Sequence, residues 1–191
     1  MRQIIFIILI LTSCGQIKSD FDQYLEQIDK IETPVTFHST KYSGTTKYQN
    51  YKTELFKKYG KSGSHELQGL IYKNERFVGL LFNIIGDINR PFLITYDRQG
   101  NKIDSLNIFP NANSSLNTET VDHATIYSDN KIEIISESKT WELNNTSDDI
   151  VKGTDKLKVD TLQFSIDNKG KISIIKKNKI NTPAANTGQK P

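Results

Sequence analysis

The sequence predicts an α+β domain, mainly antiparallel β, in which an N-terminal amphipathic helix packs on a hairpin meander. Two observations lead to this prediction. Apolar residues recur at helical spacing only before Gly60, and from Leu67 onward short apolar runs alternate with turns rich in Asp, Asn and Gly. The chain has 191 residues, of which 36% are hydrophobic, which suffices for one buried core. We therefore expect a single domain over residues 20–180.

Two short helices are expected before the strands. Asp20 is a suitable N-cap, and the apolar residues after it recur at helical spacing: Phe21, Tyr24, Leu25, Ile28 and Ile31. This helix must end before Pro34, because the residue that precedes a proline is pushed out of the helical region. After a short extended segment at residues 34–40, a second helix with an apolar side is expected over residues 51–59, ended by Gly60.

Four hairpins follow, each identified by its turn. Their strands are expected at residues 67–73 and 76–85, 92–96 and 102–109, 125–127 and 131–135, and 162–166 and 171–175. Asp and Asn accept local backbone hydrogen bonds in such turns, and Gly supplies positive φ. The run at 76–85 is almost continuously apolar, which is typical of a strand covered on both faces. Ile103 is out of phase with the apolar residues after it, which predicts a bulge near Asp104 and Ser105.

Three segments lack apolar periodicity. Residues 111–120 and 144–155 are polar and rich in turn residues, so both are expected to be loops. The tail at residues 181–191 has no strong apolar residue and is expected to be disordered. The turns at 97–100 and 167–170 share the pattern Asp, two polar residues, Gly. We interpret this pattern as one turn used twice, because the copies are too few and too far apart for a propeller repeat.

The N-terminus is organised like an export signal. Arg2 gives it a positive start, and Ile4 to Leu11 are eight consecutive apolar residues. Eight helical residues extend about 12 Å, against roughly 30 Å of membrane hydrocarbon, so this segment is too short to span a bilayer. It fits the apolar core of a signal peptide, and we expect residues 1–13 to be removed.

The next residues are Leu11, Thr12, Ser13 and Cys14. They resemble the lipobox of bacterial lipoproteins, in which an aliphatic residue and two small residues precede a cysteine. Over these first 14 residues the chain resembles the many small outer-membrane lipoproteins of uncharacterised role. The resemblance implies signal recognition at Leu11, Thr12 and Ser13, diacylglyceryl transfer to the sulfur of Cys14, cleavage before it and fatty acylation of the new amino group. Residues 14–19 would then be a lipidated tether, anchored stably in the membrane.

Cys14 is the only cysteine of the chain. Disulfide frameworks and zinc sites with two or more thiolates are therefore excluded, and lipidation would remove the thiol from catalysis. Gly15 takes the place of the acidic residue that resembles an inner-membrane retention signal, which favours the outer membrane. No cofactor is expected beyond the covalent diacylglycerol and fatty acyl groups.

The common catalytic motifs are incomplete. There is no G-x-S-x-G segment, and Gly60-Lys61-Ser62 lacks the upstream glycine of a phosphate-binding loop. His38, His65 and His123 are too far apart in sequence for a local metal pair, so no metal site is expected. Asp122 adjoins His123, but neighbours in a strand point to opposite faces, and we expect a surface or capping role for this histidine.

Basic charge is concentrated between Lys41 and Lys61, where lysines and tyrosines interleave. Four of these residues are candidates for a partner surface: Tyr42, Lys47, Tyr48 and Lys52. Such a surface suits a glycan, an anionic polymer or a protein; the alternative is that the aromatic residues pack on the sheet while the lysines are solvated. Because only four of the 25 basic residues are Arg, no nucleic-acid partner is expected.

Together these patterns favour a lipid-anchored envelope protein that acts as a non-enzymatic binding or interaction module. Two alternatives stay open. One is a small envelope hydrolase whose site is assembled from sequence-distant residues, and the other is an immunity or inhibitor lipoprotein.

Overall fold

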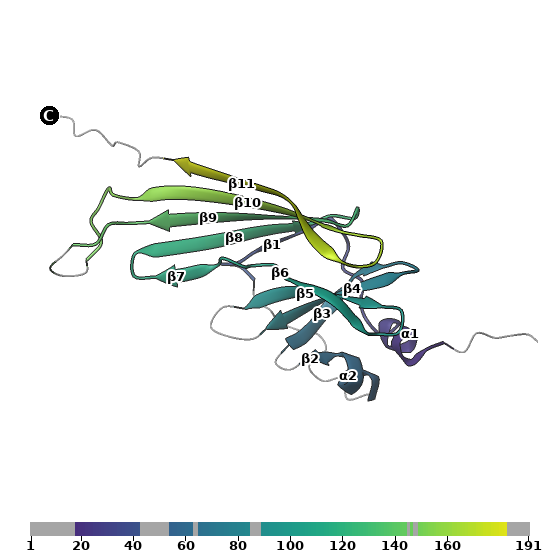
Figure 1. Cartoon of the computed structure of the whole chain (residues 1–191). Helices are drawn as coiled ribbons and strands as arrows, with labels where there is room; N and C mark the ends of the chain where they lie inside the picture. Colours follow the sequence, from purple (N-terminus) through teal and green to yellow (C-terminus); the bar gives the residue numbers. More distant parts are fainter. Residues whose placement is uncertain are drawn as a thin grey trace, which may run out of the picture.

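The computed structural model describes residues 18–42, 54–62, 65–84, 89–144, 146 and 149–182. Within them the chain is mostly antiparallel β, with two sheets and two short helices (Figure 1). The expected mainly antiparallel β class is confirmed, but the hairpins are divided between two sheets instead of forming one meander. The segment expected to be a signal peptide and residues 14–17 of the tether lie outside the described residues.

The first sheet, sheet A, is a simple meander. Its strands pair in chain order: β2 (Lys61–Ser62), β3 (His65–Lys73), β4 (Phe77–Ile84), β5 (Arg90–Asp97) and β6 (Lys102–Asn107). The central strand β4 is buried along almost its whole length, as the apolar run at 76–85 predicted. The pairing of β5 with β6 shifts so that Ile103 has no partner, which places the bulge one residue before Asp104.

The second sheet, sheet B, is built mainly from the C-terminal part of the chain. Its strands are ordered β1 (Val35–His38), β8 (Thr118–Ile126), β9 (Lys131–Thr140), β10 (Lys156–Ile166) and β11 (Ile172–Thr182), and β7 (Asn113–Ser115) also pairs with β8. Several of these strands are longer than expected. β7 and the start of β8 form a hairpin inside the segment expected to be a loop. β11 runs through Asn181 and Thr182, where the disordered tail was expected to begin.

The helices α1 (Asp20–Leu25) and α2 (Glu54–Tyr59) are short. Ser19 is the N-cap of α1, because its side chain accepts the Asp22 N–H, so Asp20 is not the cap. The helix expected to continue toward Pro34 ends at Leu25. The chain leaves the helix there to pair with β3, where the Ile31 N–H donates to the Leu70 carbonyl at 2.8 Å. Tertiary pairing therefore overrides the helical periodicity that Ile28 and Ile31 continue.

Each face of sheet A belongs to a different apolar cluster. On one face the helices and the sheet share a cluster of Phe21, Tyr24, Leu25, Ile28, Phe56, Leu67, Leu70, Val78, Leu80, Phe82 and Ile94. On the other face sheet A packs against sheet B. Sheet B contributes six buried residues to this inter-sheet core: Ala124, Ile126, Ile132, Ile134, Phe164 and Ile166. The order of layers is therefore helices, sheet A, sheet B.

Sheet A covers only part of sheet B (Figure 1). We call residues 122–126, 131–136 and 162–166 the covered half, because it holds the buried residues of sheet B. Residues 118–121, 137–140 and 156–161 form the projecting half, in which the strands extend past sheet A and every residue is partly or fully exposed. The two halves are continuous strands of one hydrogen-bonded ladder.

The two similar turns have the same structure. Asp97 Oδ1 accepts the N–H groups of Gln99 and Asn101, at 2.9 and 2.8 Å. Asp167 Oδ1 accepts those of Lys169 and Lys171 in the same way, at 2.8 and 2.9 Å. A glycine with positive φ ends each turn. The repeated sequence pattern is thus a repeated turn.

Candidate ligand pocket

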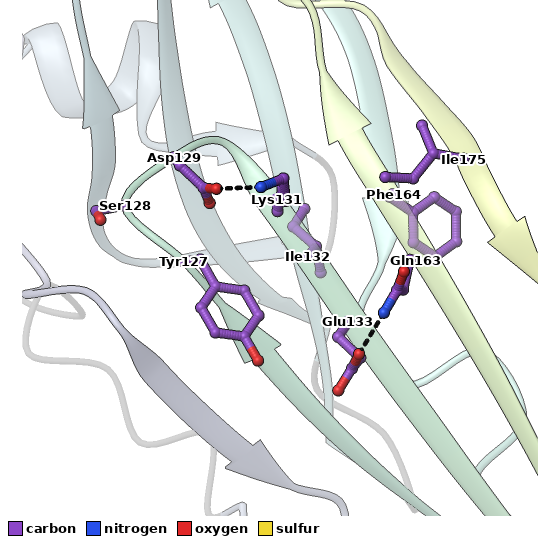
Figure 2. Close-up of a pocket in the computed structure, with 9 residues that line it drawn as sticks. All are labelled: Tyr127, Ser128, Asp129, Lys131, Ile132, Glu133, Gln163, Phe164 and Ile175. Carbon is purple, nitrogen blue, oxygen red and sulfur yellow. Dashed lines mark hydrogen bonds and ion pairs between the residues drawn. The ribbon is translucent and has the colours of Figure 1, made fainter.

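A hollow of about 520 Å³ lies where β8 turns into β9 at one end of sheet B. Figure 2 shows its lining residues: Tyr127, Ser128, Asp129, Lys131, Ile132, Glu133, Gln163, Phe164 and Ile175. Tyr127 stands on one side, Phe164 and Ile175 stand on the other, and Glu133 and Gln163 lie between them. The volume falls within the range of small-ligand sites, so this hollow is the first candidate for a functional site.

The β8–β9 turn forms one wall of the pocket. The Tyr127 N–H donates to the Lys131 carbonyl at 2.9 Å, and Asn130 has a φ of 63°, a left-handed conformation that Asn tolerates. Lys131 Nζ lies 2.5 Å from Asp129 Oδ2. This hydrogen bond holds the pKa of Asp129 below its usual value. The two charges at the rim therefore offset each other, and the wall presents mainly the Tyr127 ring, which is 38% exposed.

The floor of the pocket is formed by side chains of β9 and β10, which point alternately to the two faces of sheet B. Ile132 and Phe164 point into the inter-sheet core and are almost fully buried. Their neighbours Glu133 and Gln163 point to the other face of the sheet. There Gln163 Nε2 donates to Glu133 Oε2 at 2.6 Å, a bond that joins the two strands at the base of the pocket.

A bulge in the last hairpin supplies the remaining apolar wall. Gln163 pairs with Lys176 and Phe164 pairs with Ile174, so the intervening Ile175 has no partner on β10. Its side chain stands 55% exposed beside Phe164. An extra residue in one strand bends that strand and redirects a side chain, and here it brings an isoleucine to the pocket.

The chemistry of the pocket is suited to binding. Apolar surface comes mainly from the exposed Tyr127 and Ile175, with a small part from Phe164, which is 7% exposed. Orienting polar groups come from the Glu133–Gln163 pair and the Asp129–Lys131 pair. With two acids and one lysine, the lining carries about one negative charge. Nowhere in the described part of the chain do three or more His, Cys, Asp or Glu residues form a group that could hold a metal ion. The pocket can therefore hold an apolar group and hydrogen-bond a donor next to it.

The residues predicted from sequence lie elsewhere. Tyr42 packs edge-on against Phe37 and Phe109, with ring centroids 5.8 and 5.7 Å away, and its burial raises the pKa of its hydroxyl. Much of this ring is thus used in packing beside the inter-sheet core. The other three residues of the candidate partner surface, Lys47, Tyr48 and Lys52, lie outside the described residues. So do the lipobox residues Leu11, Thr12, Ser13 and Cys14.

A histidine pair lies on the solvent face of sheet B. Pairing of β1 with β8 sets His38 opposite His123, with ring centroids 4.2 Å apart and planes at 84°. Asp122 points to the other face, where it is buried and its Oδ2 accepts the N–H groups of Asn111 and Ala112, both at 2.8 Å. The expectation that Asp122 and His123 face opposite ways is confirmed. The contact between His38 and His123 has no sequence signal, because two segments distant in sequence form it.

One sequence signal for the pocket does exist. Ile174 and Ile175 are adjacent apolar residues that break the alternation of Ile172, Ser173 and Ile174, and a break of this kind also predicted the bulge near Ile103. Applied to the last hairpin, that reasoning finds Ile175. It does not find the partner residues across the sheet, which depend on register.

Comparison of the chain with protein-family models, curated proteins and solved structures gave no match. Among the described helices, none has both the length and the apolar character needed to cross a bilayer.

Proposed function

We propose that this protein is a lipid-anchored protein of the bacterial envelope that acts as a non-enzymatic binding module. One observation carries the binding part of the proposal: the pocket is continuous with exposed isoleucines on β11. Ile175 lines the pocket and belongs to β11, on which Ile174, Ile175 and Ile180 are 58, 55 and 61% exposed. Exposed apolar side chains next to a polar-rimmed pocket, such as Ile174 and Ile175, are typical of interaction sites.

The anchoring part rests on the lipobox resemblance and on the position of α1. We propose that residues 1–13 are removed, that Cys14 carries the lipid and that residues 14–19 are a tether in the outer membrane. α1 follows at once, and its buried residues Phe21, Tyr24 and Leu25 share a cluster with sheet A. The helix thereby joins the tether to the sheet. It lies at one end of the molecule, and the C-terminal end of β11 lies at the opposite end (Figure 1).

The proposed function is tested by site-specific photo-crosslinking in the bacterium that makes the protein, with labelled palmitate in the medium. A photo-reactive amino acid replaces Tyr127 in the pocket wall or, as a matched control, Ile150, which is 46% exposed and outside the pocket. We expect the wild-type chain to carry the label and the substitution at Tyr127 to give a discrete adduct that the control lacks. We expect Cys14→Ala to give an unprocessed, unlabelled precursor.

The two parts of the proposal fail separately. Normal processing of Cys14→Ala contradicts the lipobox interpretation and leaves the binding site untouched. A labelled, correctly processed chain that gives no adduct from Tyr127, or the same adducts from Ile150, contradicts the pocket as a binding site.

A further inference from the structure

We infer that the free edge of β11 receives an extended, acidic segment of a partner protein as an added strand, with an apolar side chain of that segment seated in the pocket beside Ile175. This inference rests on the proposed function and specifies the class of partner. It combines three observations: an open strand edge, lysines on that strand and the pocket at its bulge.

β11 is a long strand with one free edge. It extends 11 residues and pairs with β10 on one side, and within the described ranges no strand pairs with its other side. Only its beginning is closed: Asp104 Oδ2 accepts the Ile172 N–H at 3.0 Å and lies 3.2 Å from Lys171 Nζ. Past Ile172 the outward N–H and C=O groups form a template for another strand.

The positive charge of β11 indicates that an incoming strand would be acidic. Lys176, Lys177 and Lys179 lie on β11, which contains no Asp or Glu. Because Lys176 pairs with Gln163 while Lys177 and Lys179 pair with Leu162 and Asp160, the lysines occupy both faces of the sheet. The ion pairs of neighbouring strands use other lysines: Lys131, Lys139, Lys156 and Lys158. Asp or Glu side chains on an incoming strand would lie beside these charges, and opposite charges on adjacent strands attract.

Other occupants fit this edge less well. A second copy of β11 would bring lysines against lysines, which is destabilising across adjacent strands. The segment at 183–191 carries Lys190 and no acidic residue, so it does not complement the edge. Lysines also protect edges from aggregation, but protection alone does not explain three exposed isoleucines on the same strand.

The pocket gives the added strand a register. In strand addition, main-chain hydrogen bonds supply affinity and side-chain pockets supply specificity. Ile175, at the pocket, directly precedes Lys176, and the last of the three lysines is Lys179. The matching segment therefore has an apolar residue and Asp or Glu within about four positions of it along the strand.

The test is selection of a displayed random nonapeptide library on the full lipidated chain in detergent micelles. We expect enriched peptides to be acidic, to contain an apolar residue near the acids and to slow hydrogen exchange at β11 amides. The triple variant Lys176→Glu/Lys177→Glu/Lys179→Glu should weaken binding at least tenfold. A matched variant with the same change in charge at exposed positions, Lys73→Glu/Lys102→Glu/Lys152→Glu, should bind like the wild type. Binding should also weaken as salt is raised.

Ile175→Asp provides a second test that does not depend on charge at the lysines, since this exposed side chain can change without loss of core packing. This substitution should abolish peptide enrichment while the melting temperature stays within a few degrees of that of the wild type.

Three results would overturn the inference: no peptide enrichment on the wild-type chain, enrichment of peptides without a preference for acidic residues, or equal binding by both triple variants. If the wild-type chain enriches no peptide while the β11 triple variant self-associates, the lysines serve only to protect the edge from aggregation, and the inference is also overturned. If any of these results is accompanied by a crosslinked adduct at Tyr127, the proposed binding function stands and only the addition of a strand to β11 is rejected.

Discussion

The covered and projecting halves of sheet B are made of the same strands but are stabilised differently. In the covered half Ile132, Ile134 and Phe164 pack against sheet A. In the projecting half the same strands carry polar pairs, such as Thr120 Oγ1 with Ser138 Oγ at 2.9 Å and the ion pair of Lys158 with Asp160. These pairs are only partly buried and each contributes little, so the backbone ladder is maintained by its continuity with the covered half. Stability is concentrated in one half, and exposed strand surface is concentrated in the other.

The largest effect expected from this comparison is at Ile134. Its side chain is fully buried in the covered half, so Ile134→Ala should leave a cavity and lower the free energy of unfolding by about 4 kcal/mol. Ile180→Ala makes the same chemical change at a β11 residue that is 61% exposed, and should alter stability by no more than about 0.5 kcal/mol. Urea unfolding followed by circular dichroism measures both. Equal losses for the two variants would show that the halves do not differ in the way described.

Two glycines outside the strands give a second, smaller contrast: Gly170 lies in the β10–β11 turn beside the covered half, and Gly153 lies in the β9–β10 connection beside the projecting half. Gly170 and Gly153 have φ values of 83° and 79°, so alanine is strained at both. Added at Gly170, a Cβ would lie 2.8 Å from Ile103 Cδ1 and 3.0 Å from Phe77 Cβ, whereas at Gly153 it would meet nothing within 4 Å. We expect losses of about 1 kcal/mol for Gly153→Ala and about 3 kcal/mol for Gly170→Ala. The difference between the two melting curves isolates the packing cost. If the two variants lose the same stability, the residues around Gly170 can move to accommodate the new methyl group without a packing cost.

The same contrast explains which parts of the fold were predicted from sequence. Sheet A and the covered half alternate or run apolar because they are buried, so their hairpins were found. Residues 137–140 and 156–161 pair as strands in which every residue is partly or fully exposed, so burial leaves no alternating pattern in them. The sequence there shows no strand pattern, so it predicts no strand at these residues. The loop predicted over residues 144–155 lies between them, and its described part contains no named strand. These strand segments pair because they continue the hydrogen-bonded ladder of the covered half, and such pairing cannot be predicted from apolar periodicity.

The candidate sites divide in a similar way. Lipidation at Cys14 can be predicted from sequence because its signal is local: an aliphatic residue, two small residues and the cysteine follow directly on an apolar run. The pocket was missed because Tyr127, Gln163 and Ile175 are brought together only by the register of four strands, β8 to β11, and one bulge. The turn that holds Tyr127 was predicted as a hairpin, but what lies beside it depends on long-range pairing.

The smallest expected effect concerns the solvent face of the covered half, where His38 contacts His123. Burial, His123 and Lys41 lower the pKa of His38, while Glu137 acts in the opposite direction. The unfolded chain therefore binds a proton at this position more readily than the folded chain does. The stabilisation associated with neutral His38 is fully present above pH 6.5, near the unfolded pKa. It is lost as the pH falls below about 6.5 and through the lowered pKa of the folded state.

Replacement of His38 by Gln removes this titration and leaves a polar residue on the strand. We expect the wild type to lose more stability than His38→Gln between pH 7.5 and pH 5.0, as measured by urea unfolding at each pH. Comparison with the variant cancels the titration of other groups, including aspartates whose pKa values lie lower. An equal loss of stability in both proteins would mean that the charge on His38 does not affect the pairing of β1 with β8. A greater loss in the wild type would show that the solvent face of the covered half, unlike its buried face, responds to mild acid by weakening the β1–β8 contact.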